Sequence, residues 1–308
     1  PFYGLVHLMD THMMYEADKQ RIERCLETFD YPNQDLETFF AEHSESEFIS
    51  TFLKERVNER DYEVGVARLL ARYDASVATV DQKIATLIGG LEEQDKWNET
   101  ALFVMADHGE SLTEHEVYFD HHGLYDQTTH IPLVADIPGI DAQRREELVQ
   151  PIDLFPTFLS LFEVPPKGEY DGKNLLPLLK GNHSDEWRDE VFIEEAYTQR
   201  RTAIRTDEWK YITYQPDKTL DEKWGSSLEC GYCKKIHGAE EELYHLISDP
   251  EEKENCIDKN QSVVEDLRKR VEQFEQAIEY PETDSTAESP QFDDEKEVLQ
   301  RLENLGYK

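Results

Sequence analysis

The chain has 308 residues, and 68 acidic against 32 basic side chains give it a formal net charge of −36 at pH 7. That charge opposes binding to nucleic acid and to anionic membranes, because either partner would require a large basic patch. It indicates adaptation to high salt, where ions screen the self-repulsion; an ordinary acidic protein is the alternative. Hydrophobic residues make up 38% of the chain and fall in periodic blocks, so we expect a packed core.

The cysteine content and the beginning of the chain bear on its compartment. Four cysteines, at 25, 230, 233 and 256, are too few and too scattered for a disulfide framework, and we expect a cytoplasmic protein. The longest apolar runs fall short of the ~18 residues that a membrane span needs. Because Pro1 leads directly into an apolar stretch, we expect a piece of a longer protein whose targeting signal would lie upstream.

The first two thirds of the chain alternate between strand and helix patterns. Apolar positions in the long helical segment step by three and four, and residues 100–106 (TALFVMA) are almost continuously apolar, as in a strand buried on both faces of a parallel sheet. This alternation predicts an α/β sandwich with ligands beyond the carboxyl ends of the strands. The expected elements are strands at 1–8, 100–106 and 131–135, a helix at 62–91 that stops near Gly89-Gly90, and a helix at 153–162.

The pattern changes after about residue 195. Short strands without intervening helices predict a small antiparallel sheet with one covering helix. We therefore expect a catalytic α/β part at 1–195, a small α+β subdomain at 196–280, and an acidic linker with a terminal helix at 281–308. The elements expected in this half are strands at 202–205, 209–214 and 242–246, a helix at 263–278, a linker at 281–294 and a short helix around 298–305.

The most specific local feature is Asp107-His108, which follows the strand at 100–106 and precedes Gly109. A carboxylate and an imidazole on one turn can face the same cation; oxygen ligands suit Ca²⁺ or Mg²⁺, and the imidazole makes the site softer. The alternative is a plain turn in which Asp107 caps the next segment and His108 is solvated.

Seven of the 11 histidines fall in two segments that we expect at the same edge of the sheet. Imidazoles gathered there can bind an oxyanion or act as a general acid near neutral pH. Each one alone is more simply a surface or core histidine. The seven are His7, His12, His108, His115, His121, His122 and His130.

The motif Cys230-Gly231-Tyr232-Cys233 suggests zinc, but a second pair of ligands is missing nearby. Cys256 and His237 complete such a site only if the fold brings them together. A pair of reduced thiols or a local disulfide is the alternative.

The order of segments resembles the sulfatases of the alkaline phosphatase superfamily. The resemblance runs from residue 1 through the small sheet, and its combination of motifs is specific although no single motif is. The stretches that carry it are PFYGLVHLMDTHMMY at 1–15, YDASVATVDQKIATLIGGL at 73–91, ALFVMADHGESLTEH at 101–115, HHGLYDQTTHIPLV at 121–134, PIDLFPTFLSLFEVPP at 151–166, DGKNLLPLLKG at 171–181, TAIRTDEWKYI at 202–212 and EELYHLISDPEEKEN at 241–255.

The resemblance implies a sulfate ester hydrolase with an incomplete mixed sheet sandwiched by helices, followed by the antiparallel subdomain. Its partner would be a small sulfated or phosphorylated ester. Asp107 and His108 would bind a divalent cation, Ca²⁺ rather than Mg²⁺. His12 would contact a sulfate oxygen or the leaving group, and His121, with His122 as the near alternative, falls where the family often has a sulfate-binding Lys.

The family's nucleophile, a formylglycine made within a Cys/Ser-x-Pro/Ala-x-Arg motif, has no counterpart here: Cys25 is followed by Leu26-Glu27-Thr28. We therefore expect formylglycine upstream, outside this chain, and an isolated chain without activity. A phosphodiesterase or phosphonate monoester hydrolase of the same superfamily is the alternative enzyme. A truncated, non-catalytic remnant is the alternative from another class.

Overall fold

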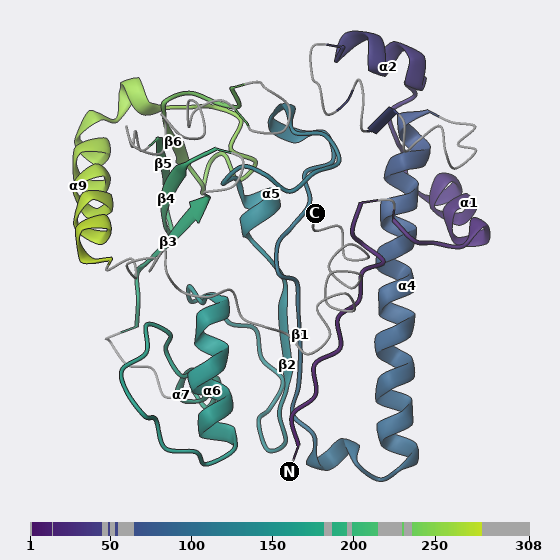
Figure 1. Cartoon of the computed structure of the whole chain (residues 1–308), viewed down its shortest axis with the longest axis vertical. Helices are drawn as coiled ribbons and strands as arrows, with labels where there is room; N and C mark the ends of the chain where they lie inside the picture. The colour runs from purple at the N-terminus through teal and green to yellow at the C-terminus, as the bar shows by residue number, and fades with distance from the viewer. Residues whose placement is uncertain are drawn as a thin grey trace, which may run out of the picture.

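The structure is a computed structural model that describes residues 2–13, 15–44, 49, 53–54, 65–181, 187–195, 199–214, 230 and 236–278. It places a long helix beside a two-stranded ribbon, with a four-stranded sheet and its covering helix on the other side of the ribbon (Figure 1). Among the described residues, no helix is long and apolar enough to cross a membrane. The elements are α1 (Lys19–Thr28), α2 (Leu36–Glu42), α4 (Val66–Glu93), η2 (Trp97–Glu99), β1 (Leu102–Met105), η3 (Glu114–Glu116), α5 (Asp126–Thr129), β2 (Leu133–Asp136), η4 (Pro151–Asp153), α6 (Leu154–Leu161), α7 (Leu176–Leu179), β3 (Glu190–Glu195), β4 (Arg201–Thr206), β5 (Trp209–Tyr214), β6 (Glu241–His245), η5 (Ile257–Lys259) and α9 (Gln261–Ala277).

Helix α4 is confirmed as one long amphipathic helix of 28 residues. It does not stop at Gly89-Gly90 as expected, because neither glycine has the positive φ of a helix terminator and the cap lies at Gln94. Helices α1 and α2 lie in a charged stretch whose helical signals in the sequence are weak. Each begins at an aspartate whose carboxylate accepts a backbone N–H: Asp18 from Arg21 and Asp35 from Thr38.

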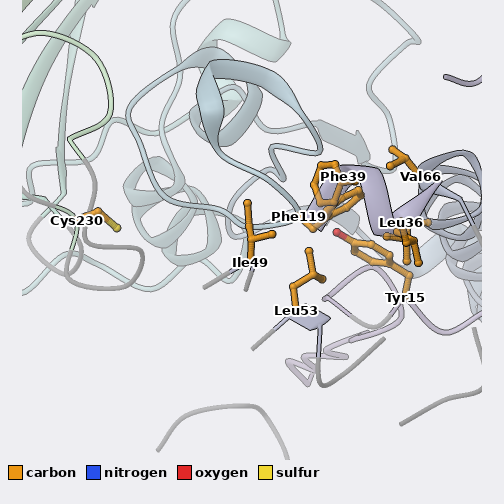
Figure 2. Packing of buried hydrophobic residues seen from close by; sticks show 9 residues of the cluster. Tyr15, Leu36, Phe39, Ile49, Leu53, Val66, Phe119 and Cys230 are labelled. Atoms are coloured by element: carbon orange, nitrogen blue, oxygen red, sulfur yellow. The ribbon is translucent and has the colours of Figure 1, made fainter. Parts of the chain in front are cut away.

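A core of aromatic and aliphatic side chains joins this helical layer to the loop after β1. Figure 2 shows Tyr15, Phe39 and Phe119 gathered beside the end of α4. The rings of Phe39 and Phe119 meet edge to face, with centroids 6.2 Å apart. The cluster consists of Tyr15, Leu36, Phe39, Ile49, Leu53, Val66, Leu69, Phe119 and Cys230.

Strand β1 pairs antiparallel with β2, with Leu102 opposite Asp136 and Met105 opposite Leu133. The expectation of a doubly buried strand in a parallel sheet is therefore wrong: within the described residues β1 has no parallel neighbour, and its side chains are only half-buried. The strand expected at 1–8 is wrong too. Residues 2–8 form no regular structure, and Phe2 is 81% exposed, because an apolar run becomes a strand only where it finds a pairing partner.

The C-terminal sheet has the order β3-β4-β5-β6 with every pair antiparallel, which confirms the small sheet. The expected covering helix is confirmed as α9, whose Val264, Leu267 and Val271 are buried in a cluster that includes Tyr211 and Leu243 of the sheet. β3 was not expected, since charged residues occupy three of its six positions. A second cluster of Leu124 and Tyr125 with Ala203, Ile212 and Tyr244 joins the loop before α5 to this sheet.

A buried ion pair connects the α6 region to the start of β3. The Arg188 guanidinium binds both oxygens of Asp153, a fully buried carboxylate that also accepts the Lys173 backbone N–H at 2.7 Å.

The linker expected at 281–294 and the helix expected around 298–305 lie outside the described residues. The domain boundaries at 195 and 280 stay predictions.

Candidate active site

The turn after β1 carries the candidate cation ligands Asp107 and His108, and Gly109 holds it against α5. The Gly109 N–H donates to the carbonyl oxygen of Thr128 at 2.8 Å. A Cβ at Gly109 would lie 2.0 Å from the carbonyl oxygen of Gln127. Only glycine therefore permits this close approach of two backbone segments.

His12 lies on a short irregular segment that α4 fixes in place. Lys83 of α4 donates to the buried Asp10 carboxylate at 2.6 Å. Arg72, about three turns earlier along the same helix, donates from Nε to the carbonyl oxygen of Tyr15 at 2.9 Å. The long helix thus anchors the segment on both sides of His12.

All five of the predicted site residues, from three separate segments, line one cleft of about 1050 Å³. The rings of His108 and His121 stack with centroids 4.1 Å apart, and the ring of His12 lies 6.3 Å from that of His121. Asp107 lines the same cleft. The structure therefore brings the first segment and the turn after β1 to the same cleft, even though the first segment is not a strand.

The donor atoms of Asp107 and His108 fit a shared divalent cation. Nδ1 of His108 lies 2.8 Å from the carbonyl oxygen of its neighbour Gly109, so this nitrogen carries the proton and Nε2 keeps a lone pair. That Nε2 lies 3.9 Å from Oδ1 of Asp107. Two ligands bound at about 2.4 Å to a Ca²⁺ ion, at right angles or wider, are separated by about 3.4 Å or more.

The electrostatics of His121 favour a neutral ring. Burial lowers its pKa, and the nearby imidazoles of His108 and His12 act in the same direction, against the opposing effect of the Asp120 carboxylate. A neutral imidazole has a single N–H, and its other nitrogen carries a lone pair. Asp120 lies 3.4 Å from Nδ1 of His121, so the Nε2 edge is the one left for a ligand.

Two carboxylates of the site escaped sequence reasoning. Glu110 accepts the hydroxyl proton of Tyr15 at 2.6 Å, and burial, together with the Asp120 charge, raises the Glu110 pKa to about 8. Asp120 lies 3.4 Å from Nδ1 of both His121 and His122. Glu110 follows the Asp-His-Gly turn directly and could have been noticed; no spacing in the sequence marks Asp120.

The structure separates the remaining histidines. His130 also lines the cleft, but its side chain is 70% exposed. His115 stacks on Tyr125 at 3.7 Å, and His7 is exposed and not among the residues of the cleft. His122 lines the cleft but is 5% exposed, with its Nε2 3.2 Å from Nε2 of His237.

The cysteines behave differently from one another. Cys256 does not join Cys230, since its thiol donates to the carbonyl oxygen of Leu243 in the C-terminal sheet. Cys230 is fully buried beside His122 and His237. Cys233 lies outside the described residues.

The sequence is similar to those of curated sulfatases. It is 27% identical over 251 residues to arylsulfatase K of Gallus gallus, an alignment that spans 78% of this chain and 42% of the relative. It is 26% identical over 210 residues to the delta 4,5-hexuronate-2-O-sulfatase of Bacteroides thetaiotaomicron, spanning 64% and 38%. The chain thus covers less than half the length of these curated relatives.

The fold is similar to solved structures. It matches a putative sulfatase from Bacteroides thetaiotaomicron with a TM-score of 0.56 at 23% identity, over 70% of this chain and 44% of the other. It matches the phosphonate monoester hydrolase of Silicibacter pomeroyi with a TM-score of 0.57 at 18% identity, over 82% and 50%. The family model for the C-terminal region of N-sulphoglucosamine sulphohydrolase matches residues 113–225. The sulfatase model matches residues 1–164, more than half of the 308, and the chain belongs to the sulfatase family.

Proposed function

We propose that this chain forms one side of the active site of a sulfate ester hydrolase. The observation that carries the proposal is the convergence of His12, Asp107, His108 and His121 on one cleft. Three chain segments far apart in sequence deliver a carboxylate and three imidazoles to the same space. Such a set suits an anionic group with several oxygens, such as a sulfate ester, better than it suits an apolar ligand.

Asp107 and His108 would hold a divalent cation, Ca²⁺ rather than Mg²⁺. Ca²⁺ tolerates more ligands and less regular geometry, whereas Mg²⁺ demands a near-ideal octahedron, and an exposed turn bearing one carboxylate and one imidazole suits the more tolerant ion. When bound, the cation would withdraw charge from the sulfate oxygens and stabilise the charge that develops during ester cleavage.

The chain's own imidazoles would orient the ester. His121 has Nδ1 facing Asp120 and would present Nε2 to a sulfate oxygen, to which it donates once the bound anion makes the ring take up a second proton. His12, across the cleft from the turn after β1, would contact a second oxygen or give a proton to the leaving group. His122 is turned toward His237, so of the two neighbouring histidines we assign the sulfate contact to His121.

The nucleophile would come from outside these 308 residues. The sulfatase family implies a formylglycine, and the chain contains no Cys/Ser-x-Pro/Ala-x-Arg motif from which to make one. We therefore expect the isolated chain to bind the cation but to hydrolyse nothing. The high acidic charge supports a protein adapted to high salt, and the few scattered cysteines support a reducing, cytoplasmic environment.

A sulfated sugar is the substrate class best supported, because one relative is a hexuronate-2-O-sulfatase. The alternative is a phosphonate or phosphate ester, supported by the likeness to a phosphonate monoester hydrolase. Sulfate and phosphate esters have the same tetrahedral shape, so the cleft alone does not distinguish them. The charge of the bound group is the physical difference: a monoanionic sulfate ester needs fewer cations around it than a dianionic phosphate ester.

The test uses the longest form of the protein that its gene encodes, with 4-nitrophenyl sulfate and 4-nitrophenyl phenylphosphonate as paired substrates. We expect a higher kcat/KM on the sulfate ester. Asp107→Asn and His121→Ala should each lower it by about 100-fold or more, as loss of a group that stabilises transition-state charge does. His245→Gln is the control, because His245 pairs with Glu208 at the surface of the C-terminal sheet. Unchanged hydrolysis in both site variants would refute the proposal.

A further inference from the structure

A second group of metal-binding side chains lies buried behind the cleft and has no role in the proposed hydrolysis. His122 comes from the loop before α5, whereas Cys230 and His237 come from the stretch that precedes β6. The three residues are 5%, 0% and 3% exposed. They join two parts of the chain that are more than one hundred positions apart.

The separation of the two imidazole nitrogens matches that between two ligands of a single tetrahedral ion. The Nε2 atoms of His122 and His237 lie 3.2 Å apart, and their rings meet at 57° rather than stacking. The candidate ligand atoms of all three residues lie within 4.8 Å of one another. In a tetrahedral zinc site, Zn–N bonds of about 2.0 Å and a Zn–S bond of about 2.3 Å place nitrogens about 3.3 Å apart and a nitrogen about 3.6 Å from the sulfur.

The orientation of His122 also suits a metal ligand. Asp120 Oδ2 lies 3.4 Å from Nδ1 of His122, on the side of the ring away from His237. A carboxylate behind a ligating imidazole is the usual way in which proteins fix the ring and its tautomer.

Cys230 belongs to the hydrophobic cluster of the helical layer but lies at one side of it. Figure 2 shows Cys230 beyond Ile49, away from the aromatic side chains of that cluster.

The surroundings are acidic. Glu195 accepts the Gly123 N–H at 3.0 Å, next to His122, and burial raises the Glu195 pKa. Asp120 lies on the other side of the ring. A positive ion among buried carboxylates and a thiolate lowers the cost of burying their charges.

We propose that His122, Cys230 and His237 form a binding site for a thiophilic divalent cation, with Zn²⁺ as the best match. One thiolate and two imidazoles are typical donors for Zn²⁺, whereas the carboxylate and imidazole of the turn after β1 suit the harder Ca²⁺. The site would tie the loop that carries His121 to the C-terminal subdomain. It is therefore a structural site, separate from the proposed hydrolysis.

The first experiment titrates the metal-stripped protein with Co²⁺, which gives a near-ultraviolet thiolate-to-metal absorption band when a cysteine binds it. We expect one equivalent of Co²⁺ to produce this band and Zn²⁺ to displace it. Cys230→Ser should abolish the band. His237→Ala and His122→Asn should weaken binding by more than about 100-fold, since even partners outside the ligand shell contribute about 10–100-fold.

Matched controls separate this site from its neighbours. Cys256→Ser removes a thiol that lies elsewhere, in contact with Leu243, and Asp107→Asn alters only the candidate calcium ligand; both should keep the band at wild-type affinity. Asp107→Asn should impair the proposed hydrolysis and keep the band. The hydrolysis proposal and the zinc proposal can therefore fail independently of each other.

Thermal stability after metal removal provides a second, independent measurement. Zn²⁺ should raise the Tm of the stripped protein, whereas Ca²⁺ at the same concentration should not reproduce the effect in Asp107→Asn. The proposal is overturned if the stripped wild type shows no thiolate band and no Zn²⁺-dependent rise in Tm. It is equally overturned if Cys230→Ser and His237→Ala bind Co²⁺ as the wild type does.

Discussion

Lys210 is the residue whose loss most directly tests how the candidate site is fixed to the C-terminal sheet. Its ammonium lies 2.5 Å from Oδ1 of Asp126 and 2.8 Å from Oε1 of Glu252, and the side chains of Lys210 and Glu252 are 0% exposed. Glu252 also accepts the backbone N–H of Asp126 at 2.5 Å. Asp126 begins α5, so this network holds the loop that carries His121 against β5.

Replacing Lys210 with Met keeps the length of the side chain and removes its charge. Asp126 then keeps Arg205, whose guanidinium lies 3.4 Å away, and the imidazole of His130, 3.7 Å away. Removing one partner of a buried ion pair costs about 3–5 kcal/mol, because the other charge stays buried without compensation. We expect Lys210→Met to lower the free energy of unfolding by that amount at pH 7.

The penalty should depend on pH in a definite direction. Burial raises the pKa of Asp126, but Lys210 and Arg205 outweigh it and hold that pKa below its usual value. A carboxyl with a lowered pKa stabilises the fold above its unfolded pKa of about 3.9, and this contribution is lost as the pH falls through the folded pKa. Without Lys210 both carboxyls take up protons more easily, so the difference between the wild type and the variant should shrink toward acidic pH.

Urea unfolding at a fixed high KCl concentration measures the effect, at pH 7 and at a pH below about 3.9. Lys259→Met is the matched control, because the Lys259–Glu254 pair is more than 70% exposed on both sides and should leave stability near that of the wild type. In Lys210→Met/Glu252→Gln the cost should be smaller than the sum of the single substitutions. A Lys210→Met penalty below about 1 kcal/mol, or one that does not change with pH, would refute the reasoning.

Three further outcomes follow from the structure. Gly109→Ala should lower Tm and weaken cation binding, because its Cβ would lie 2.0 Å from the carbonyl oxygen of Gln127; thermal melts and calcium calorimetry measure both, and unchanged values would contradict the close approach. Burial lowers the pKa of His115, so the neutral ring favours folding above its unfolded pKa of about 6.5 and this stability is lost as the pH falls. His115→Phe, which keeps the stacking on Tyr125, should therefore lose less stability than the wild type between pH 7 and pH 5, and parallel pH curves would argue against this. Since the net charge is −36, Tm should rise from about 0.1 M to 1 M KCl as the screening length falls from about 10 Å to 3 Å, whereas isosmotic sucrose alone should not account for the rise.

Periodicity predicted the parts of the fold that bury a continuous apolar face. The three-and-four spacing of α4 and α9, and the short apolar strands β4 to β6, each bury one face against a neighbour, and such faces leave a pattern in the sequence. β3 escaped notice because only Val191 of its six residues is fully buried. The apolar run at 1–8 failed as a strand for the opposite reason: its pattern is strong, but the described residues contain no strand that pairs with it.

The residues of the candidate site likewise fall into two groups: those that local sequence identifies and those whose role depends on contacts between distant segments. Asp107 and His108 could be identified because both lie on one turn at the end of one strand, where local sequence decides the arrangement. Asp120 could not be identified, and His237 could be named only as a conditional ligand beside the cysteine motif, since their importance depends on contacts between segments distant in the chain. His121 and His122 were alternatives for one role in the sequence; they contact different partners in the structure.

The two adjacent imidazoles explain how a cleft and a buried cluster can share one loop. His121 stacks on His108 at the cleft, while His122 meets His237 in the interior. Asp120 lies 3.4 Å from both rings through different oxygens, so a single carboxylate orients them together. Displacing His122 from its buried partners would move Asp120, and with it the Nδ1 contact that sets the tautomer of His121. The geometry of the proposed sulfate contact therefore depends on packing against the C-terminal sheet, although none of the residues that we assign to the ester belongs to that sheet.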